Sequence, residues 1–562
     1  MRTLVAVVLQ ALVAVVFAAA VAAATPATAA AAPPVLPQDP DRPPAGYRLT
    51  ANQAVAAAER SGRVREELRT RPGLAPAGYT RGGGRWQVSF FRDRAELVQA
   101  HVSDADGRVL EVWTGPQVAW EMARGYPGAF GRKVNSPWVW IPLCLAFLAP
   151  FVDPRRPLRL LHLDLLVLLG FSVSHLFFNR GEISASVPLV YPVLAYLLVR
   201  MLAAGLRPRT GRGPLVPLMP VGALVLALIF LVGFRVALNM VDSNVIDVGY
   251  AGVLGADRIA DRESLYEGVF PSDNRTGDTY GPAAYLTYLP FEQALPWSGR
   301  WDSLPAAHAA AVAFDLLTMA GLFLLGRRAR AGPGGLALGV ALAYAWAAYP
   351  YTLFALQSNS NDALVAVSVV WALVAVSSPP ARGALVALGA LAKFAPLAVA
   401  PVFAAGTGER RARSIALFSV AFAGVAVLCV LPFVPDGGLG ELYDRTLGAQ
   451  IGRKSPFSVW GQWPSSKPGQ WIVEGAAVAL GVLVAFVPRR RTPAQVAALA
   501  ASVLLLVEAA TTHWFYLYVV WFAPLVLFAL FSEHPTEPAP VRGRRAVSLR
   551  RATRRAPAQL RG

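Results

Sequence analysis

The chain has 562 residues, of which 55% are hydrophobic and only 15% are charged. This composition excludes a single soluble domain and indicates many membrane-spanning helices. The net charge of +18 favours a membrane protein that obeys the positive-inside rule over a nucleic-acid-binding protein, because the basic clusters fall in short gaps between apolar runs. The two cysteines, Cys144 and Cys429, lie inside apolar runs and therefore predict packing, not a disulfide framework.

Residues 1–34 predict a secretory signal peptide or a signal anchor. Arg2 precedes an apolar run over residues 4–23, and small residues follow that run. A run of about 20 apolar residues is also long enough to remain in the membrane as an anchor. In either case we expect the next segment to be exported.

A small α+β extracytoplasmic domain is expected over residues 46–125, after a proline-rich linker at 35–45. Residues 49–59 predict a helix with Thr50 as its cap. Alternating apolar and polar residues predict three strands, over 84–91, 96–102 and 108–115. The sequence Asp-Gly-Arg-Val-Leu-Glu-Val-Trp-Thr-Gly at 106–115 resembles a PepSY-type domain. This resemblance implies a binding or regulatory module without catalytic residues of its own.

Residues 136–531 predict a polytopic membrane domain. Its apolar runs lie at about 136–152, 159–178, 186–205, 214–239, 305–326, 334–356, 362–377, 383–405, 413–433, 471–487, 494–510 and 513–531. If the small domain is outside, three arginine-bearing loops fall inside, at 153–158, 206–213 and 327–333. These loops agree with the positive-inside rule.

Residues 383–405 do not fit a full crossing. Counting them as one would place the basic clusters at 409–413 and 489–491 outside, together with the arginine-rich tail at 532–562. The segment also carries Lys393 in mid-run and prolines after it, which disfavour a continuous span. We therefore expect a re-entrant pair of short helices on the cytoplasmic side, eleven crossings after the signal segment, and a cytoplasmic tail.

The polar segment 241–304 carries ten carboxylates against four arginines and is expected outside. Asp242 and Asp247 follow a span closely, where a membrane enzyme can hold a catalytic base. For most of the other acids we expect only the role of a solvated loop. Tyr250 and Tyr280 supply aromatic surfaces that either anchor the chain at the interface or stack on sugar rings.

Further polar residues are expected on the same outer side. Arg453 and Lys454 predict either a headgroup anchor or a clamp for an anionic group such as a lipid phosphate. His513 lies near the end of a span, where both a structural and a site role are open. The remaining candidates for substrate contacts are Asn361 in the 357–362 loop, Lys393 and Trp460.

The order of these motifs resembles the polytopic GT-C glycosyltransferases, and most closely glycosyltransferase family 87, the polyprenol-phosphate-mannose-dependent mannosyltransferases. The resemblance covers roughly residues 210–531. It rests on Asp247-Val-Gly-Tyr250, Asp257-Arg258, Leu265-Tyr266, Thr279-Tyr-Gly-Pro282, Leu289-Pro-Phe291, Lys393-Phe-Ala-Pro396, Arg453 with Ser455-Pro-Phe-Ser-Val-Trp460, and His513. In contrast to family members, this chain has a signal segment, an exported domain and three extra spans before the acidic segment.

The resemblance implies a GT-C fold, an inverting mechanism, and an aspartate base in the first outer loop of the family. Asp247 fits that position best, and Asp242 is the competitor. The expected donor is a polyprenyl-phosphate sugar, with mannose as the expected hexose. The expected acceptor is an extracytoplasmic glycolipid or cell-envelope glycan. The resemblance also implies a multi-pass protein of a bacterial plasma membrane with its active site on the extracytoplasmic face, in contact with membrane lipid and without nucleic acid.

In this chemistry a carboxylate takes the proton of an acceptor hydroxyl, and the departing phosphate is held by Arg453, Lys454 and His513.

Two functions other than a glycosyltransferase are open. Mid-span charges at Asp315 and Lys393 would suit a transporter or flippase, and the exported domain would suit a sensor scaffold. Within enzymes, a ligase for lipid-linked oligosaccharides would use similar groups. We expect no cofactor, see no zinc-type ligand spacing, and leave open whether a divalent cation assists.

Overall fold

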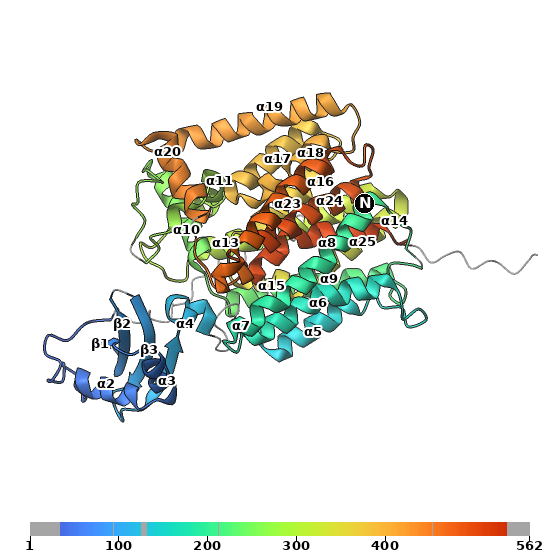
Figure 1. The fold of residues 1–562 in the computed structure, drawn as a ribbon. Helices are drawn as coiled ribbons and strands as arrows, with labels where there is room; N and C mark the ends of the chain where they lie inside the picture. The colour runs from blue at the N-terminus through green and yellow to red at the C-terminus, as the bar shows by residue number, and fades with distance from the viewer. Residues whose placement is uncertain are drawn as a thin grey trace, which may run out of the picture.

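The computed structural model describes residues 34–93, 95–124, 132–211, 213–271, 273–451 and 453–536. The predicted signal segment, apart from residue 34, and the tail from residue 537 onward lie outside the described residues. A small α+β unit, residues 34–115, stands at one end of a large helical bundle (Figure 1). The short helix α4 (Pro116–Ala119) lies between the two parts (Figure 1).

The N-terminal unit is a four-stranded antiparallel sheet in the order β1-β2-β3-β4, packed against two helices. Its elements are α2 (Ala51–Glu59), α3 (Gly62–Thr70), β1 (Ala75–Thr80), β2 (Arg85–Arg92), β3 (Ala95–Ser103) and β4 (Val109–Thr114). The predicted helix and three strands are present, and Thr50 caps α2 in a capping box with Gln53. The first strand β1 and helix α3 were not predicted. Val35, in the expected linker, forms a bridge to Thr80 on the sheet edge.

The rest of the described chain has the architecture of a multi-pass membrane protein. Seven helical segments within the described residues are long and apolar enough to cross a membrane. They are Leu160–Phe178, Ile183–Leu206, Val221–Val241, Pro305–Ala329, Arg411–Phe433, Pro464–Phe486 and Pro493–Ala510. A bent pair, α14 (Gly332–Ala348) and α15 (Pro350–Gln357), adds an eighth span if its two helices, 58° apart, count as one.

Shorter apolar helices account for the other predicted runs. They are α5 (Pro137–Leu148), α16 (Asp362–Val374), the Ala395–Ala405 segment and the Tyr516–Ser532 segment. Polytopic architecture is therefore confirmed, whereas the total of eleven crossings stays a prediction. The helices of the seven long spans are labelled in Figure 1 as α6 (Leu160–Phe178), α8 (Val190–Leu206), α9 (Val221–Val241), α13 (Pro305–Ala329), α19 (Arg411–Val430), α23 (Lys467–Phe486) and α24 (Pro493–Ala510).

The predicted break at Lys393 is present. α17 (Pro379–Ala392) ends at Lys393, and the chain then turns through η5 (Ala395–Val399) into α18 (Ala400–Ala405). Arg382, near the start of α17, donates from Nε to the carbonyl of Phe403 near the end of α18, at 2.9 Å. The two helices therefore enter and leave at the same end of the bundle, as expected for a re-entrant pair.

The arginine-bearing loops gather at that same end of the bundle. Hydrogen bonds connect loops that are far apart in sequence, including Arg411 to the carbonyl of Arg489 at 2.9 Å and Arg330 to the carbonyl of Ser532 at 2.9 Å. Arg328 likewise donates to the carbonyl of Val374 at 2.7 Å. We call this the basic end. The acidic segment, the loop over 434–466 and the N-terminal unit lie at the opposite end (Figure 1).

The acidic segment folds into short helices that cover the opposite end. They are α10 (Asp247–Ala260), η4 (Gly277–Thr279), α11 (Pro282–Leu286) and α12 (Leu289–Ala294). The following outer loop contains α20 (Gly438–Tyr443), the π-helical turn η7 (Asp444–Gly448), α21 (Ala449–Ile451), α22 (Val459–Gln462) and η8 (Pro464–Ser466). Arg445 pairs with Asp278 at 3.2 Å, so this loop is attached to the acidic segment.

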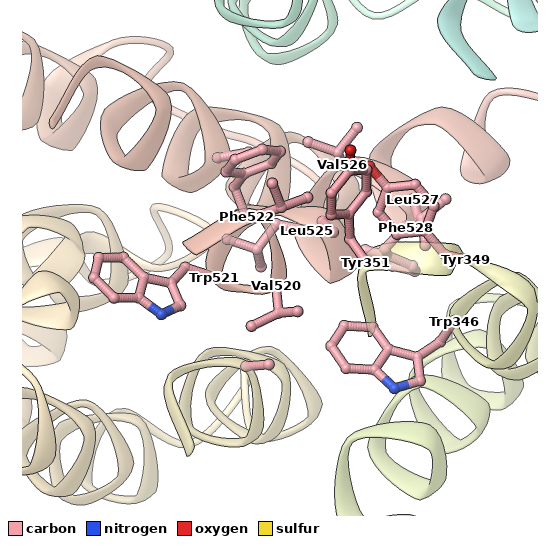
Figure 2. Packing of buried hydrophobic residues seen from close by; sticks show 14 of the residues in the cluster. Trp346, Tyr349, Tyr351, Val520, Trp521, Phe522, Leu525, Val526, Leu527 and Phe528 are labelled. Atoms are coloured by element: carbon pink, nitrogen blue, oxygen red, sulfur yellow. The ribbon is translucent and has the colours of Figure 1, made fainter. Parts of the chain in front are cut away.

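Helix α25 (Val519–Ser532) runs through the centre of the bundle, and its residues 519–531 are buried. Figure 2 shows its side chains gathered with Trp346, Tyr349 and Tyr351 from the junction of α14 and α15. Nearby, Arg235 of α9 and Asp315 of α13 form a buried ion pair at 2.5 Å. Trp346 donates to the same carboxylate at 2.8 Å, so the mid-span charge of Asp315 is fully partnered.

Candidate active site

A cavity of about 720 Å³ opens at the end of the bundle opposite the basic end. Five of the predicted site residues line it: Asp247, Tyr280, Lys393, Arg453 and His513. They come from five separate stretches of the chain, which fits a site assembled by the fold. Other lining residues are Trp120, Trp301, Asp362, Gln450, Gln470, Glu474, Tyr518 and Trp521.

Asp247 is the first residue of α10, and the loop at 357–362 holds it in place. The backbone N–H groups of Asn244 and Ile246 donate to the carbonyls of Gln357 and Ser358, at 3.1 and 3.2 Å. A Cβ at Gly249 would lie 2.2 Å from the backbone oxygen of Asn359. The glycine in Asp-Val-Gly-Tyr is thus required by the close approach of this loop to α10.

The carboxylate of Asp247 is exposed to the space inside the cavity, and the cavity walls enclose that space. This environment raises the pKa of Asp247, because the carboxylate loses part of its hydration. The positive charges of Arg453 and Lys393 oppose that rise in pKa, and the charge of Asp362 adds to it. A carboxylate with a raised pKa is a better proton acceptor than an ordinary surface aspartate.

Arg453 lies over the ring of Trp120, with its guanidinium carbon 5.4 Å from the ring centroid. None of the carboxylates that the structure describes forms an ion pair with it. The guanidinium therefore keeps its hydrogen-bond donors available to an anion in the cavity. Gln450, which precedes it, donates to the hydroxyl of Thr279 at 3.3 Å and links this loop to the acidic segment.

Lys393 forms an ion pair with Asp362, whose side chain is 1% exposed. The ammonium also lies 5.7 and 5.6 Å from the ring centroids of Tyr518 and Trp521. Trp521 donates from Nε1 to the same carboxylate oxygen at 3.0 Å. The other oxygen of Asp362 is buried and has no hydrogen-bond partner among the residues that the structure describes. The pair sits in the cavity wall, where the break between α17 and η5 places it.

His513 lies between the ring of Trp120 and that of Phe457, with centroid distances of 5.6 Å to each. Its Nδ1 is 2.8 Å from the hydroxyl of Ser455, and that hydroxyl accepts from the backbone N–H of Phe457 at 3.2 Å. Burial lowers the pKa of His513 well below its usual value, and the charges of Arg453 and Lys393 lower the pKa further. The imidazole is therefore neutral at pH 7 and acts as a hydrogen-bonding group, not as a cation.

Tyr280 is placed by the turn before α11. A Cβ at Gly281 would lie 2.0 Å from the backbone oxygen of Leu391, so the Tyr-Gly-Pro turn sits directly against the end of α17. Tyr266 donates to the carbonyl of Tyr280 at 2.8 Å. Burial raises the pKa of Tyr280 well above its usual value, and the charge of Asp247 raises the pKa further. Its phenol thus stays protonated beside the carboxylate.

Three other candidates lie outside the cavity lining. Asp242 accepts a hydrogen bond from the backbone N–H of Lys133 at 2.9 Å, which gives it an anchoring contact away from the cavity. Tyr250 is 1% exposed and stacks on Trp301 at 4.8 Å, inside the core of the acidic segment. Asn361 is buried beside Asp362, and within the described part of the chain its amide has no hydrogen-bond partner.

Lys454 and Trp460 also lie outside the lining. Lys454 is exposed, whereas Arg453 is half-buried and lines the cavity. Trp460 donates from Nε1 to the carbonyl of Ala509 at 2.8 Å, which fastens the loop to α24. Of the expected cation pair, therefore, only Arg453 reaches the cavity.

Several lining residues were not among the predicted site residues, and two of them contact the predicted cations Arg453 and Lys393. Trp120 lies within the stretch 46–125, which was expected to carry no catalytic residue, and only the long-range fold brings it to the cavity. Asp362 opens α16 in the 357–362 loop, and a charge at the start of an apolar run was a signal that could have found it. Within the described residues there is no group of three or more His, Cys, Asp or Glu side chains that could hold a metal ion.

No protein-family model matches the chain, and no curated protein sequence matches it.

Proposed function

We propose that this protein is a membrane glycosyltransferase of the GT-C type that transfers a hexose, in the first instance mannose, from a polyprenyl-phosphate sugar to a glycolipid or cell-envelope glycan. One observation carries the proposal. A carboxylate of raised pKa, Asp247, shares a single cavity with the guanidinium of Arg453, which forms no ion pair with a carboxylate of the described residues. These are the groups that a proton transfer and a departing phosphate require.

In the proposed step, Asp247 takes the proton of an acceptor hydroxyl. The hydroxyl oxygen forms a bond to the anomeric carbon, and the bond from that carbon to the phosphate oxygen breaks with its electron pair. The phosphate carries the resulting negative charge, which Arg453 stabilises. Attack opposite to the leaving group inverts the anomeric configuration. Neutral His513 serves as a hydrogen-bonding group to the phosphate or sugar, a role that differs from the cationic one expected from the sequence.

The shape of the cavity suits a lipid-linked donor. Besides the polar groups, its lining includes the apolar residues Ala395, Ala398, Val507, Phe515 and Leu517. An isoprenoid chain can be buried along such a surface. The rings of Tyr280, Trp301 and Tyr518 offer flat faces on which a sugar can stack.

The side of the membrane supports the same donor class. The cavity lies opposite the basic end, and the positive-inside rule assigns the basic end to the cytoplasm. Nucleotide sugars are cytoplasmic, so a site on the outer face of a plasma membrane needs a donor that is already attached to a lipid.

A transporter or flippase is the weaker alternative. The mid-span charge that would favour transport, Asp315, is held by Arg235 and Trp346 and has no free oxygen for a passing solute or ion. Lys393 lies at a helix break in the cavity wall and pairs with Asp362. Both charges thus have structural partners.

The proposal is tested with the purified full chain in proteoliposomes that contain envelope lipid extract as acceptor. Polyprenyl-phosphate mannose, polyprenyl-phosphate glucose and GDP-mannose, each labelled in the sugar, are supplied separately. We expect label to move from one lipid-linked donor into the acceptor fraction, with release of polyprenyl phosphate, and no transfer from GDP-mannose. Movement of an intact lipid donor between leaflets without loss of its sugar would instead support the flippase.

The pH dependence of transfer gives a second prediction. Because the charge of Arg453 lowers the pKa of Asp247, Arg453→Gln is expected to raise that pKa. At a given acidic pH a smaller fraction of Asp247 is then ionised, so the acid limb of the kcat/KM profile moves to higher pH. We expect this shift in profiles normalised to their maxima, in addition to weaker donor binding.

Two controls accompany this pH profile. Arg453→Lys keeps the charge and is expected to restore most of the acid limb. Lys454→Gln removes an exposed charge outside the cavity and should leave the profile as in the wild type. An acid limb that is the same in Arg453→Gln as in the wild type would show that Arg453 does not act on the group whose ionisation limits the rate.

A further inference from the structure

The cavity has one wall that does not come from the membrane helices or from their loops. After β4 the chain forms α4 (Pro116–Ala119) and η1 (Glu121–Arg124), and Trp120 lies between these two turns. Its ring is 5.6 Å from the ring of His513 and 5.4 Å from the guanidinium carbon of Arg453. Ala119 and Met122 line the cavity beside it.

This segment is attached on both sides. Arg124 donates to the amide oxygen of Gln99 on β3 at 2.9 Å, which ties the segment to the sheet. Gln117 donates to the carbonyl of Ala123 at 3.1 Å, and its amide lies against Gly181 between α6 and α8. A Cβ at Gly181 would lie 2.6 Å from the amide nitrogen of Gln117. The position of Trp120 is therefore set by the N-terminal unit and the membrane helices together.

The contact with Trp120 holds the guanidinium of Arg453 in the place of an ion pair. Among the described residues no carboxylate pairs with this guanidinium, so an aromatic face is the group that fixes it. A cation held over a ring keeps its N–H groups free in the plane of the guanidinium. The same ring covers one face of His513.

We propose that the segment joining the N-terminal unit to the membrane helices completes the active site, with Trp120 as a positioning residue that holds Arg453 toward the phosphate of the lipid-linked donor. The identity of that phosphate rests on the proposed function. The contact itself rests only on the geometry of Trp120, Arg453 and His513. This segment, which the N-terminal unit helps to position, is thus a part of the site.

The first experiment measures the Kd of polyprenyl phosphate, without a sugar, for the full chain in nanodiscs. We expect Trp120→Ala to weaken binding about tenfold, since a desolvated cation–π contact is worth about that factor. Trp120→Phe is expected to restore most of the affinity. Trp138→Ala removes a tryptophan that is 88% exposed and should leave the Kd unchanged. In an Arg453→Ala background, Trp120→Ala should have no further effect, and additive losses would overturn the positioning role.

The second experiment does not depend on any donor. Diethyl pyrocarbonate modifies neutral imidazole, and its rate at His513 is followed by mass spectrometry of the peptide. We expect a severalfold faster modification of His513 in Trp120→Ala than in the wild type or in Trp138→Ala. An equal rate in all three proteins would overturn the proposed wall. A faster rate in Trp120→Ala, with no binding of polyprenyl phosphate by the wild type, would support the wall and overturn the proposed donor.

Discussion

Asp247→Asn is expected to lower sugar transfer by about 10²- to 10⁴-fold, the range that a positioned general base contributes. The amide has nearly the same size as the carboxylate but cannot accept the proton of the acceptor hydroxyl. The backbone N–H of Val248 interacts with the Asp247 carboxylate, and an asparagine oxygen can accept from the same group, so the fold should tolerate the change. The measurement is kcat at saturating donor in proteoliposomes, with the amount of folded protein determined by size-exclusion chromatography.

Asp242→Asn is the matched comparison, because Asp242 was the other candidate base. Its carboxylate accepts the N–H of Lys133, and an asparagine oxygen can accept the same hydrogen bond. Since Asp242 lies outside the cavity lining, we expect Asp242→Asn to keep most of the wild-type rate. The reverse result, with Asp242→Asn inactive and Asp247→Asn active, would assign the base to Asp242.

Lys393→Met is expected to destabilise the fold by about 3–5 kcal/mol, the usual effect of removing one partner from a buried ion pair. The side chain of Asp362 is 1% exposed, and without Lys393 its charge would be left with the indole N–H of Trp521. Methionine keeps most of the length and packing of the lysine. The measurement is the apparent Tm of the detergent-solubilised chain at pH 7.5.

A double variant distinguishes the effect of the unpaired Asp362 charge from the effect of altered packing in the cavity wall. Asp362→Asn in the Lys393→Met background removes the carboxylate charge that has lost its partner. We expect the double variant to recover much of the lost Tm. A double variant that is no more stable than Lys393→Met would show that packing around Lys393, and not the charge of Asp362, sets the stability.

Most of the long helices of the bundle could be predicted, because a helix that crosses a bilayer must be apolar over most of its length. Apolar runs long enough to span a bilayer mark the helices, and arginines mark the loops of one end. The lysine and prolines at 393–401 correctly predicted a break in the helix. The structure has two helices there, and the start of α17 contacts the end of α18 through Arg382. Short runs such as 362–374 are less clear, since length alone does not distinguish a span from a buried helix.

The site could be predicted in part. Asp247 and Lys393 were predicted because a charge beside or within an apolar run is costly unless it has a function or a partner. Arg453 was predicted because two adjacent cations on the outer side run against the positive-inside bias. The partner of Lys393, Asp362, could not be identified without the distance between α16 and α17. Trp120 was missed because its role comes from the docking of the N-terminal unit, about 330 positions before Arg453.

Other expected site residues lie outside the cavity lining. Lys454 adjoins Arg453 in the sequence, yet only Arg453 lines the cavity, and adjacency in sequence does not show where a side chain points. Tyr250 lies one turn along α10 from Asp247, but residues 249–256 of this helix are buried on all sides. Only the first turn of α10 reaches the cavity, and sequence spacing does not show where a helix enters the core.

The most direct test of the central claim is the position of a donor in the cavity. Cryo-electron microscopy of the full chain with a non-transferable phosphonate analogue of polyprenyl-phosphate mannose would measure it. We expect the phosphonate within hydrogen-bond distance of Arg453, the anomeric carbon facing Asp247, and the isoprenoid chain along Ala398 and Val507. An analogue bound elsewhere on the protein, or with its sugar turned away from Asp247, would contradict the proposed mechanism.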